Sequence, residues 1–157
     1  MKGDRRFMPK YRLLNSEELQ EFQKEFIEFL VVNGIEPEKW EYIKENDTAS
    51  VDKIIELFSD VILESVLRKV NFIEIRSKKY VQAIQCLSDK MICIALEDSK
   101  SDDEKSGSED QKENSLSIYK TEKKYTETRE KEIFDLIEKG YKISDGDLFK
   151  KLQLASI

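Results

Sequence analysis

The sequence predicts an α+β fold, and three observations lead to this prediction. The chain of 157 residues contains only 5 Gly and 2 Pro, a composition that suits long helices better than a loop-rich barrel or sandwich. Apolar residues recur at helical spacing through the N-terminal half. Between residues 70 and 97 the pattern changes to β-branched and aromatic runs, which are typical of strands.

The N-terminal half predicts three helices, at about 16–33, 37–45 and 49–68. Asn15 and Glu18 have the spacing of a capping box at the start of the first helix. Gly34 suits the end of that helix, because glycine adopts the left-handed conformation at low cost. Pro37 suits the first turn of the second helix. The third helix is the longest and most apolar, so we expect it to be the central one.

The middle of the chain predicts an antiparallel meander of three strands, at about 70–76, 80–87 and 91–97. A turn at 88–90 would join the last two. The segment 117–124 can be a fourth strand or can lead into a helix. Two C-terminal helices are expected at about 126–139 and 145–154, the second opened by a capping box of Ser144 and Asp147.

The predicted organisation has four parts. Residues 1–12 form a flexible basic arm, and 13–97 form the helical layer plus the sheet. Residues 98–115 form a disordered acidic linker, and 116–157 form C-terminal helices that pack on the same domain. The linker is predicted to be disordered because it has no large apolar side chains to offset the entropy of ordering.

Net charge is −6, and most of it comes from one stretch. Between Glu97 and Ser115 there are eight acidic and three basic residues, which leaves −1 for the remainder. We therefore expect a folded body that is close to neutral. The acidic stretch could bind a basic partner, although a solvated spacer is the interpretation we favour.

Location is predicted from the absence of two kinds of segment. No stretch approaches the roughly 18–20 consecutive apolar residues of a membrane span, and no apolar region follows the N-terminal charges as in a secretory signal. Two cysteines do not make a disulfide framework. We expect a cytoplasmic protein without a membrane partner.

Several common kinds of catalytic site are excluded by composition. The chain has no His, which removes histidine bases, Ser-His or Cys-His nucleophile pairs and histidine-ligated metals. Neither GxxxxGK[ST] nor GxGxxG occurs. We therefore predict no catalytic residue, no metal site and no cofactor. A histidine-free enzyme with a carboxylate site is the alternative that this reasoning leaves open.

Cys86 and Cys93 are a candidate redox pair. A turn centred on Asp89 and Lys90 would place the two cysteines directly opposite each other on neighbouring strands. Their Cβ atoms would then be about 4.5–5.5 Å apart, which is near the separation that a disulfide needs. A redox switch or half of a thiolate metal site is one interpretation. Two small buried apolar residues in a reducing compartment is the interpretation we favour.

The basic arm is a candidate nucleic-acid contact. Arg5, Arg6, Lys10 and Arg12 could bind phosphate through charge alone, and the arm also contains aromatic residues that could stack on bases. Against this interpretation, the arm is short and the chain as a whole is acidic.

One family resemblance covers most of the chain. The segments YRLLNSEELQEFQKEFIEFLVVNGI, Trp40, ELFSDVILESVLRKVNFIEIRS and KEIFDLIEKGYKISDGDLFKKL resemble an uncharacterised, domain-of-unknown-function family of short bacterial proteins, mainly from Bacteroidetes. The resemblance implies a bacterial cytoplasmic protein. It implies no activity, cofactor or site residue.

The leading hypothesis is a non-enzymatic protein-interaction or regulatory protein with a protein partner. It depends on the lack of catalytic signatures and on the many charged positions. The alternative hypothesis is an RNA- or ribosome-associated protein that uses the basic N-terminal arm.

Overall fold

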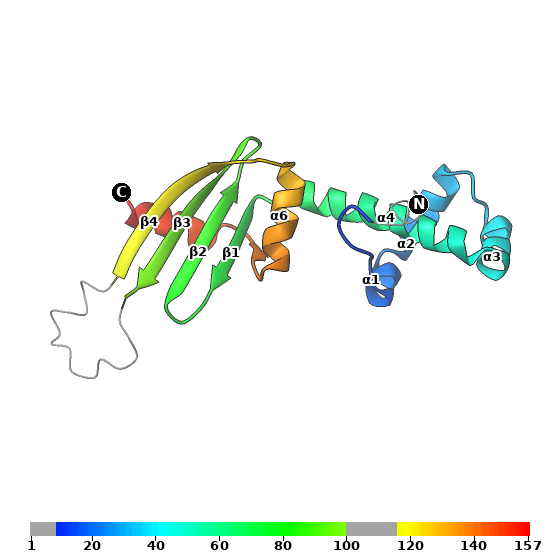
Figure 1. Ribbon diagram of the computed structural model, residues 1–157, viewed down its shortest axis with the longest axis horizontal. Coiled ribbons are helices and arrows are strands. Elements are labelled where there is room, and N and C mark those ends of the chain that lie inside the picture. The colour runs from blue at the N-terminus through cyan, green and yellow to red at the C-terminus, as the bar shows by residue number, and fades with distance from the viewer. Residues whose placement is uncertain (1–8, 100–115) are drawn as a thin grey trace, which may run out of the picture. The chain divides into compact units, whose positions relative to one another are not determined.

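The computed structural model describes residues 9–99 and 116–157. It divides at Val66 into two compact units, which we call the helical unit (9–66) and the sheet unit (67–99 and 116–157). Six helices and five antiparallel strands make up the described residues (Figure 1). The fold is α+β, but the predicted three-stranded meander followed by a pair of C-terminal helices is wrong.

The helical unit contains α1 (Ser16–Glu21), α2 (Gln23–Val32), α3 (Pro37–Asn46) and most of α4 (Thr48–Arg68). The predicted helix at 16–33 is interrupted at Phe22. Backbone hydrogen bonds continue across this point, from Phe22 to Glu18 (3.0 Å) and from Phe26 to Phe22 (2.8 Å). No Gly or Pro marks the position, so the sequence holds no signal for the interruption.

Aromatic side chains form the core of the helical unit. Phe58 of α4 is 1% exposed, and its ring contacts Phe26 at a centroid distance of 4.9 Å and Phe29 at 5.4 Å. Trp40 of α3 contacts Phe26 edge-on at 5.4 Å. Phe58 of α4 thus contacts two rings of α2, and Trp40 of α3 joins this cluster through Phe26.

The predicted capping box at the start of α1 is confirmed. The Asn15 side chain accepts the Glu18 N–H at 2.8 Å, and the Glu18 carboxylate accepts the Asn15 N–H at 3.0 Å. At the end of α2, Gly34 has φ +74, which is the left-handed conformation expected of a glycine beyond a helix end. Local capping rules therefore predict the start of α1 and the end of α2 correctly.

The sheet has the strand order β4-β3-β2-β1-β5. Its strands are β1 (Phe72–Arg76), β2 (Tyr80–Cys86), β3 (Lys90–Asp98), β4 (Leu116–Lys124) and β5 (Lys142–Ser144). The segment 117–124, which sequence reasoning left open, is therefore a strand. The two strands that sequence reasoning did not predict, β4 and β5, lie at opposite edges of the sheet.

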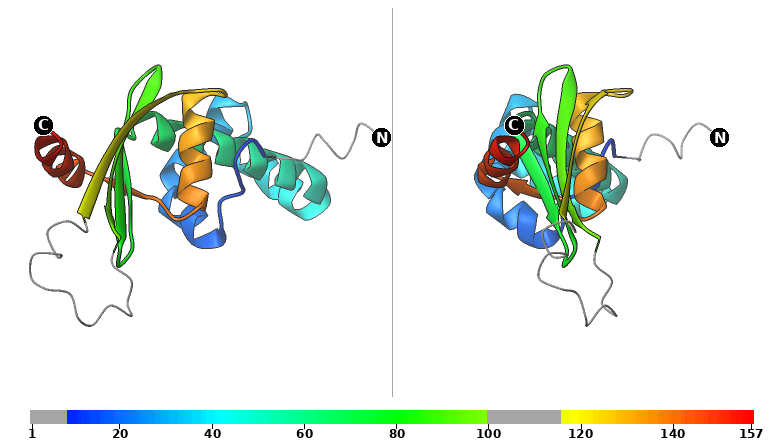
Figure 2. Two further views of the ribbon diagram at one scale, coloured as in Figure 1. Left: turned by 60° about the vertical axis from the view of Figure 1, so that its left-hand side comes forward. Right: turned by 90° about the vertical axis from the view of Figure 1, so that its left-hand side faces the viewer.

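Two helices, α6 (Arg129–Glu138) and α7 (Asp147–Ala155), lie on opposite faces of the sheet (Figure 2). Phe149 and Leu152 of α7 are buried against Ala83 and Ile94. On the α6 side, the Tyr141 hydroxyl donates to the Gln82 side chain. Each of the two C-terminal helices thus packs on a different face of the sheet.

The start of α7 differs from its prediction. Gly146 is the N-cap residue, with φ +93, and its N–H donates to the Ser144 hydroxyl at 3.3 Å. The predicted capping box of Ser144 and Asp147 is therefore wrong. Ser144 lies instead at the end of β5, opposite Phe72 of β1.

Two predicted regions fall largely outside the described residues. The basic arm (1–12) is described only from residue 9, and the acidic linker (98–115) is not described from residue 100 onward. Residues 9–12 contact α4: Tyr11 is buried and its hydroxyl bonds to Glu64. The flexible arm predicted for 1–12 stays a prediction. Within the described ranges, no helix has the length and apolar character needed to cross a membrane.

Candidate functional site

The two cysteines do not pair as predicted. In the β2–β3 register Cys86 lies opposite Met91, and Cys93 lies opposite Ile84. The turn consists of Ser88 and Asp89, because the Leu87 N–H bonds to the Lys90 carbonyl at 2.9 Å. Both cysteines are free and occupy diagonal positions on one sheet face, where Cα atoms are about 7–8 Å apart. The predicted opposed register is wrong by one residue per strand.

Neither thiol has the environment of an activated nucleophile. Burial raises the pKa of Cys86 to about 11. Burial also raises the pKa of Cys93, although Thr121 and Lys123 act in the opposite direction. The thiolate is the reactive form, and raised pKa values keep both groups protonated at neutral pH. The cysteine pair therefore has no support as a reactive centre, and a redox role stays a prediction.

The two described members of the basic arm both face carboxylates. Arg12 donates to both oxygens of Glu18 at 2.8 and 2.9 Å. The hydrogen bond from Arg12 is the largest of the effects that lower the pKa of Glu18 to about 2. The ammonium of Lys10 lies 3.2 Å from Glu64. Arg5 and Arg6 lie outside the described residues. Lys10 and Arg12 are thus already engaged inside the helical unit.

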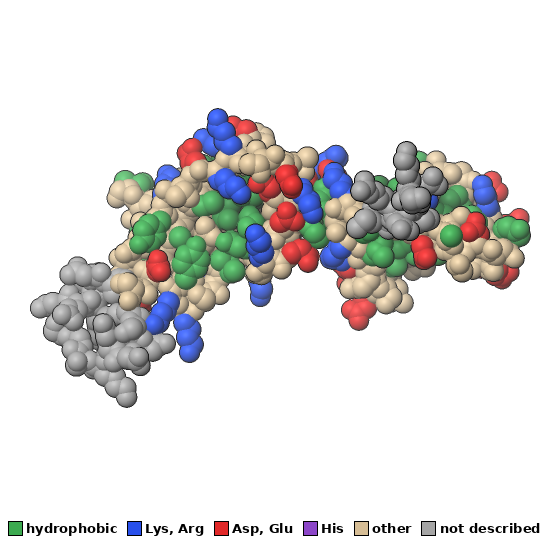
Figure 3. Space-filling model, in the orientation of Figure 1, with side chains coloured by type: hydrophobic (Ala, Val, Ile, Leu, Met, Phe, Trp, Pro, Cys, Tyr) green, Lys and Arg blue, Asp and Glu red, His purple; other side chains and the backbone are tan. Residues whose placement is uncertain are grey.

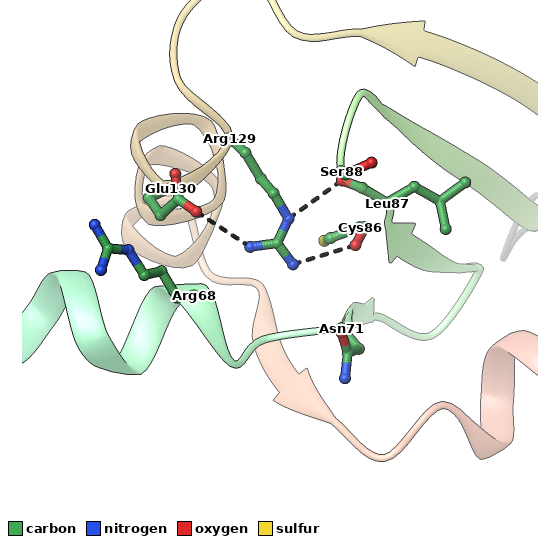
Figure 4. Close-up of a pocket in the computed structure, with 7 residues that line it drawn as sticks. All are labelled: Arg68, Asn71, Cys86, Leu87, Ser88, Arg129 and Glu130. Carbon is green, nitrogen blue, oxygen red and sulfur yellow. Dashed lines mark hydrogen bonds and ion pairs between the residues drawn. The ribbon is translucent and has the colours of Figure 1, made fainter.

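A pocket of about 660 Å³ surrounds Arg129 in the sheet unit (Figure 4). Its lining combines the end of α4, the β2–β3 turn and the first turn of α6. The lining residues are Arg68, Asn71, Cys86, Leu87, Ser88, Arg129 and Glu130. Two arginines in one pocket are the usual signal for an anion site.

The hydrogen bonds of Arg129 argue against an anion site. Its guanidinium donates to four backbone carbonyls, of Leu67 (3.1 Å), Val70, Cys86 (3.2 Å) and Leu87 (3.2 Å). It also lies 3.5 Å from the Glu130 carboxylate. Since a guanidinium has five N–H donors, these contacts use all of its capacity. Arg129 therefore joins three segments of the sheet unit.

The outer edge of β4 is an open edge of the sheet. This nine-residue strand pairs with β3 on one side only. No other described strand pairs with its outer side. Proteins usually shorten, cover or bulge their edge strands, because unpaired backbone groups recruit other strands. A long exposed edge is therefore a candidate docking surface.

The register shows which backbone groups of β4 point outward. The N–H of Asp98 bonds to Lys79 at 2.8 Å and Leu87 bonds to Lys90, so the even-numbered residues of β3 bond toward β2. Antiparallel strands alternate between the two sides, so the odd-numbered residues of β3 bond to β4. The N–H and C=O groups of Ile118, Lys120 and Glu122 consequently point away from the sheet.

The side chains along β4 fall into two halves. The first half exposes three large hydrophobic residues: Leu116 (54% exposed), Ile118 (38%) and Tyr119 (53%). The second half carries Lys120, Glu122, Lys123 and Lys124. Lys90 lies 3.0 Å from Glu122 and offsets its charge. The edge is therefore apolar at one end and basic at the other.

An open area of the sheet face adjoins this edge. The α6 helix contacts the end of the sheet near the β2–β3 turn, while Tyr119 and its cross-strand neighbours lie beyond it. Figure 3 shows hydrophobic side chains gathered on this face. Burial is the main cause that raises the pKa values of Tyr80 and Tyr141 on the same face. These hydroxyls stay uncharged at neutral pH.

A family model matches residues 8–156, which is nearly the whole chain. The chain belongs to DUF6495, a family of unknown function. The match confirms that the chain belongs to an uncharacterised family. No curated protein matches the chain, and no solved structure matches it. Membership of DUF6495 therefore assigns neither a reaction nor a binding partner to the sites described above.

The two units of this DUF6495 chain differ in charge, which the near-neutral prediction concealed. Residues 9–66 contain 14 acidic and six basic side chains, a balance of −8. The described residues from 67 onward contain 12 acidic and 15 basic side chains, a balance of +3. The basic β4 edge thus belongs to the basic unit. Among the described residues no cluster of three or more Cys, Asp and Glu side chains could hold a metal.

Sequence reasoning missed both Arg129 and the β4 edge. Arg129 lies in the first turn of α6, where the helix dipole disfavours a cation. A cation at this unfavourable helix position is a weak signal that the side chain makes a tertiary contact. For β4, the sequence left 117–124 open between a strand and a helix, and its position at the sheet edge depends on pairing that the sequence does not state.

Proposed function

We propose that the protein is a non-enzymatic interaction or regulatory protein, and that a partner protein docks on the outer edge of β4. The observation that carries the proposal is the nine-residue edge itself, with outward backbone groups at Ile118, Lys120 and Glu122. Adding a strand to a sheet edge is a common mode of peptide recognition, in which backbone hydrogen bonds supply affinity and alternate side chains supply specificity.

The chemistry of the pockets supports a non-enzymatic role. The pocket around Arg129, the 280 Å³ pocket beside β5 and the 140 Å³ pocket at the Leu116 end of β4 each contain one carboxylate. A carboxylate enzyme of the glycosidase type needs two carboxyl groups that converge on a substrate. These three pockets do not offer such a pair.

RNA or ribosome association is the alternative function, and it has less support. Binding of RNA through the basic arm would need cations that are free to contact phosphate. Lys10 and Arg12 instead contact Glu64 and Glu18. The basic balance of the sheet unit favours a polyanion in general terms. If RNA binds, its affinity should fall steeply with salt.

A bacterial, cytoplasmic location is also part of the proposal. It is supported by the two free cysteines of the sheet, since unpaired thiols are usual in reducing compartments. The Bacteroidetes origin is supported by the sequence resemblance alone.

The test compares two variants at one position of the full chain. Lys120→Pro removes an outward N–H without removing a β3–β4 hydrogen bond, because proline is tolerated on the open side of an edge strand. Lys120→Ala removes the charge and leaves the N–H. In affinity capture from native lysate, we expect the stoichiometric protein partner recovered with Lys120→Ala to be lost with Lys120→Pro. Equal recovery by both variants, with matching circular dichroism, would contradict docking at this edge.

A further inference from the structure

The polarity of β4 restricts what can pair with it. Leu116, Ile118 and Tyr119 are exposed in its first half, and its second half carries three lysines and one glutamate. Within the described part of the chain, neither Lys120 nor Lys124 has an ion-pair partner. A strand that covers this edge must therefore bring apolar contacts to one end and negative charge to the other.

A second copy of this chain, paired with Lys120 at the two-fold axis, does not meet that requirement. Two-fold antiparallel pairing centred on Lys120 would place Lys120 against Lys120, Lys124 against Leu116 and Glu122 against Ile118. Like charges directly opposite are destabilising, and charged groups facing apolar groups add no complementary contact. Lysine on an edge is itself a device against self-pairing.

We propose that the docking segment of the partner is an extended strand with acidic residues in its N-terminal half and apolar residues in its C-terminal half, paired antiparallel to β4. This inference rests on the proposed function and adds the chemistry and direction of the partner. It concerns a protein partner, and RNA is an outcome that the test distinguishes.

The direction follows from the sheet. Every strand pair of the described sheet is antiparallel. An added antiparallel strand meets Lys124 first and Leu116 last, so its acidic residues must come first. At the Leu116 end, a pocket of 140 Å³ is lined by Val81, Leu96 and Leu116, which lie on one sheet face, and by the polar residues 77–80 and Asp98. This pocket can receive the last apolar side chain of the partner.

The spacing of the partner's residues follows from the pleat. Opposed side chains share a face of the sheet, so glutamates should stand opposite Lys120 and Lys124. Lys123 already lies 3.4 Å from the Glu132 carboxylate. Valine or isoleucine should stand opposite Leu116, Ile118 and Tyr119. Threonine suits the remaining positions, because it has high strand propensity and no charge. These rules define one nine-residue peptide.

The experiment measures binding of that peptide, labelled with a fluorophore, to the full chain by anisotropy at low salt. A peptide with the same residues in reversed order is the polarity control, and we expect it to bind at least tenfold more weakly. Two further peptides carry backbone N-methyl groups. Methylation opposite Lys120 and Glu122 should abolish binding, because those amides point toward β4. Methylation opposite Tyr119 and Thr121 should leave binding unchanged.

Two matched variants of the protein complete the test. Lys120→Glu with Lys124→Glu should weaken the designed peptide about tenfold, since two favourable cross-strand pairs become repulsive. Lys150→Glu with Lys151→Glu changes the net charge equally at exposed positions of α7, and should leave the affinity unchanged.

Four results would overturn the inference. Equal binding of both peptide orders would refute the polarity, and equal effects of the two double variants would refute the role of β4. Tighter binding of a single-stranded RNA oligonucleotide at the same lysines would favour the alternative function. If the peptides fail while the partner is still lost with Lys120→Pro, the inference is wrong and the proposed function stands.

Discussion

The stability of the sheet unit should depend on the hydrogen bonds of Arg129. The change is Arg129→Lys, which keeps the positive charge and shortens the reach. The guanidinium donates to four backbone carbonyls from two segments, 67–70 and 86–87, and its side chain is 14% exposed. A lysine ammonium has three donors on a single atom, so we expect it to keep at most two of the four bonds.

The expected loss can be estimated from those bonds. Hydrogen bonds from a charged donor contribute about 1.5–3 kcal/mol each. The pocket beside Arg129 admits water that can solvate the abandoned carbonyls, so the lower end of this range applies. Two lost bonds then cost about 3 kcal/mol, which is a factor of roughly 150 in an opening equilibrium.

Labelling of the buried Cys86 thiol measures this opening directly. Cys86 is 4% exposed, and its own carbonyl accepts a hydrogen bond from Arg129. In a Cys93→Ala background, the slow reaction with an aromatic disulfide reagent reports how often the site opens. We expect Arg129→Lys to accelerate labelling about 100-fold.

The matched control is Arg76→Lys on β1. Among the described residues Arg76 forms an ion pair with Glu74 only, and its side chain is 62% exposed. The substitution should therefore change the labelling rate of Cys86 less than threefold. If Arg129→Lys also changes the rate less than threefold, the interpretation of Arg129 as a structural connector is wrong.

Two further predictions concern single residues of each unit. Glu18→Gln should destabilise the helical unit by about 1 kcal/mol at pH 7, after allowance for solvent screening, as measured by urea unfolding with Trp40 fluorescence. Arg12 and the Asn15 cap lower the pKa of Glu18 to about 2. The stability that ionised Glu18 adds to the folded state is therefore complete above its unfolded pKa and is lost as the pH falls toward 2. A stability difference between wild type and Glu18→Gln that does not change with pH would contradict this. Gly146→Ala should destabilise the sheet unit far more than Gly34→Ala destabilises the helical unit. Both have positive φ, but only at Gly146 would a Cβ lie 2.7 Å from the Phe72 ring, and equal shifts in melting temperature would refute the steric argument.

The helices were predictable because their signals are local. The capping box of Asn15 and Glu18 and the glycine at position 34 act within a few residues. The class α+β followed from a change of period in the sequence. The interruption at Phe22 was not predictable, since no residue there disfavours a helix.

The sheet was harder to predict because pairing is not local. A shift of one residue in the β2–β3 turn, from 89–90 to 88–89, was enough to misplace Cys86 and Cys93. Strand β5 has three residues and is defined only by its contact with β1. The candidate site shares this limit, because an edge exists only when the order of all strands is known.

The measurement that tests the docking edge most directly is residue-resolved amide hydrogen exchange of β4. Without the designed peptide, the outward amides of Ile118, Lys120 and Glu122 should exchange quickly, and those of Tyr119 and Thr121 should exchange slowly. With the peptide bound, the three outward amides should become protected. Protection of the outward amides before the peptide is added, or no gain of protection after binding, would contradict the account.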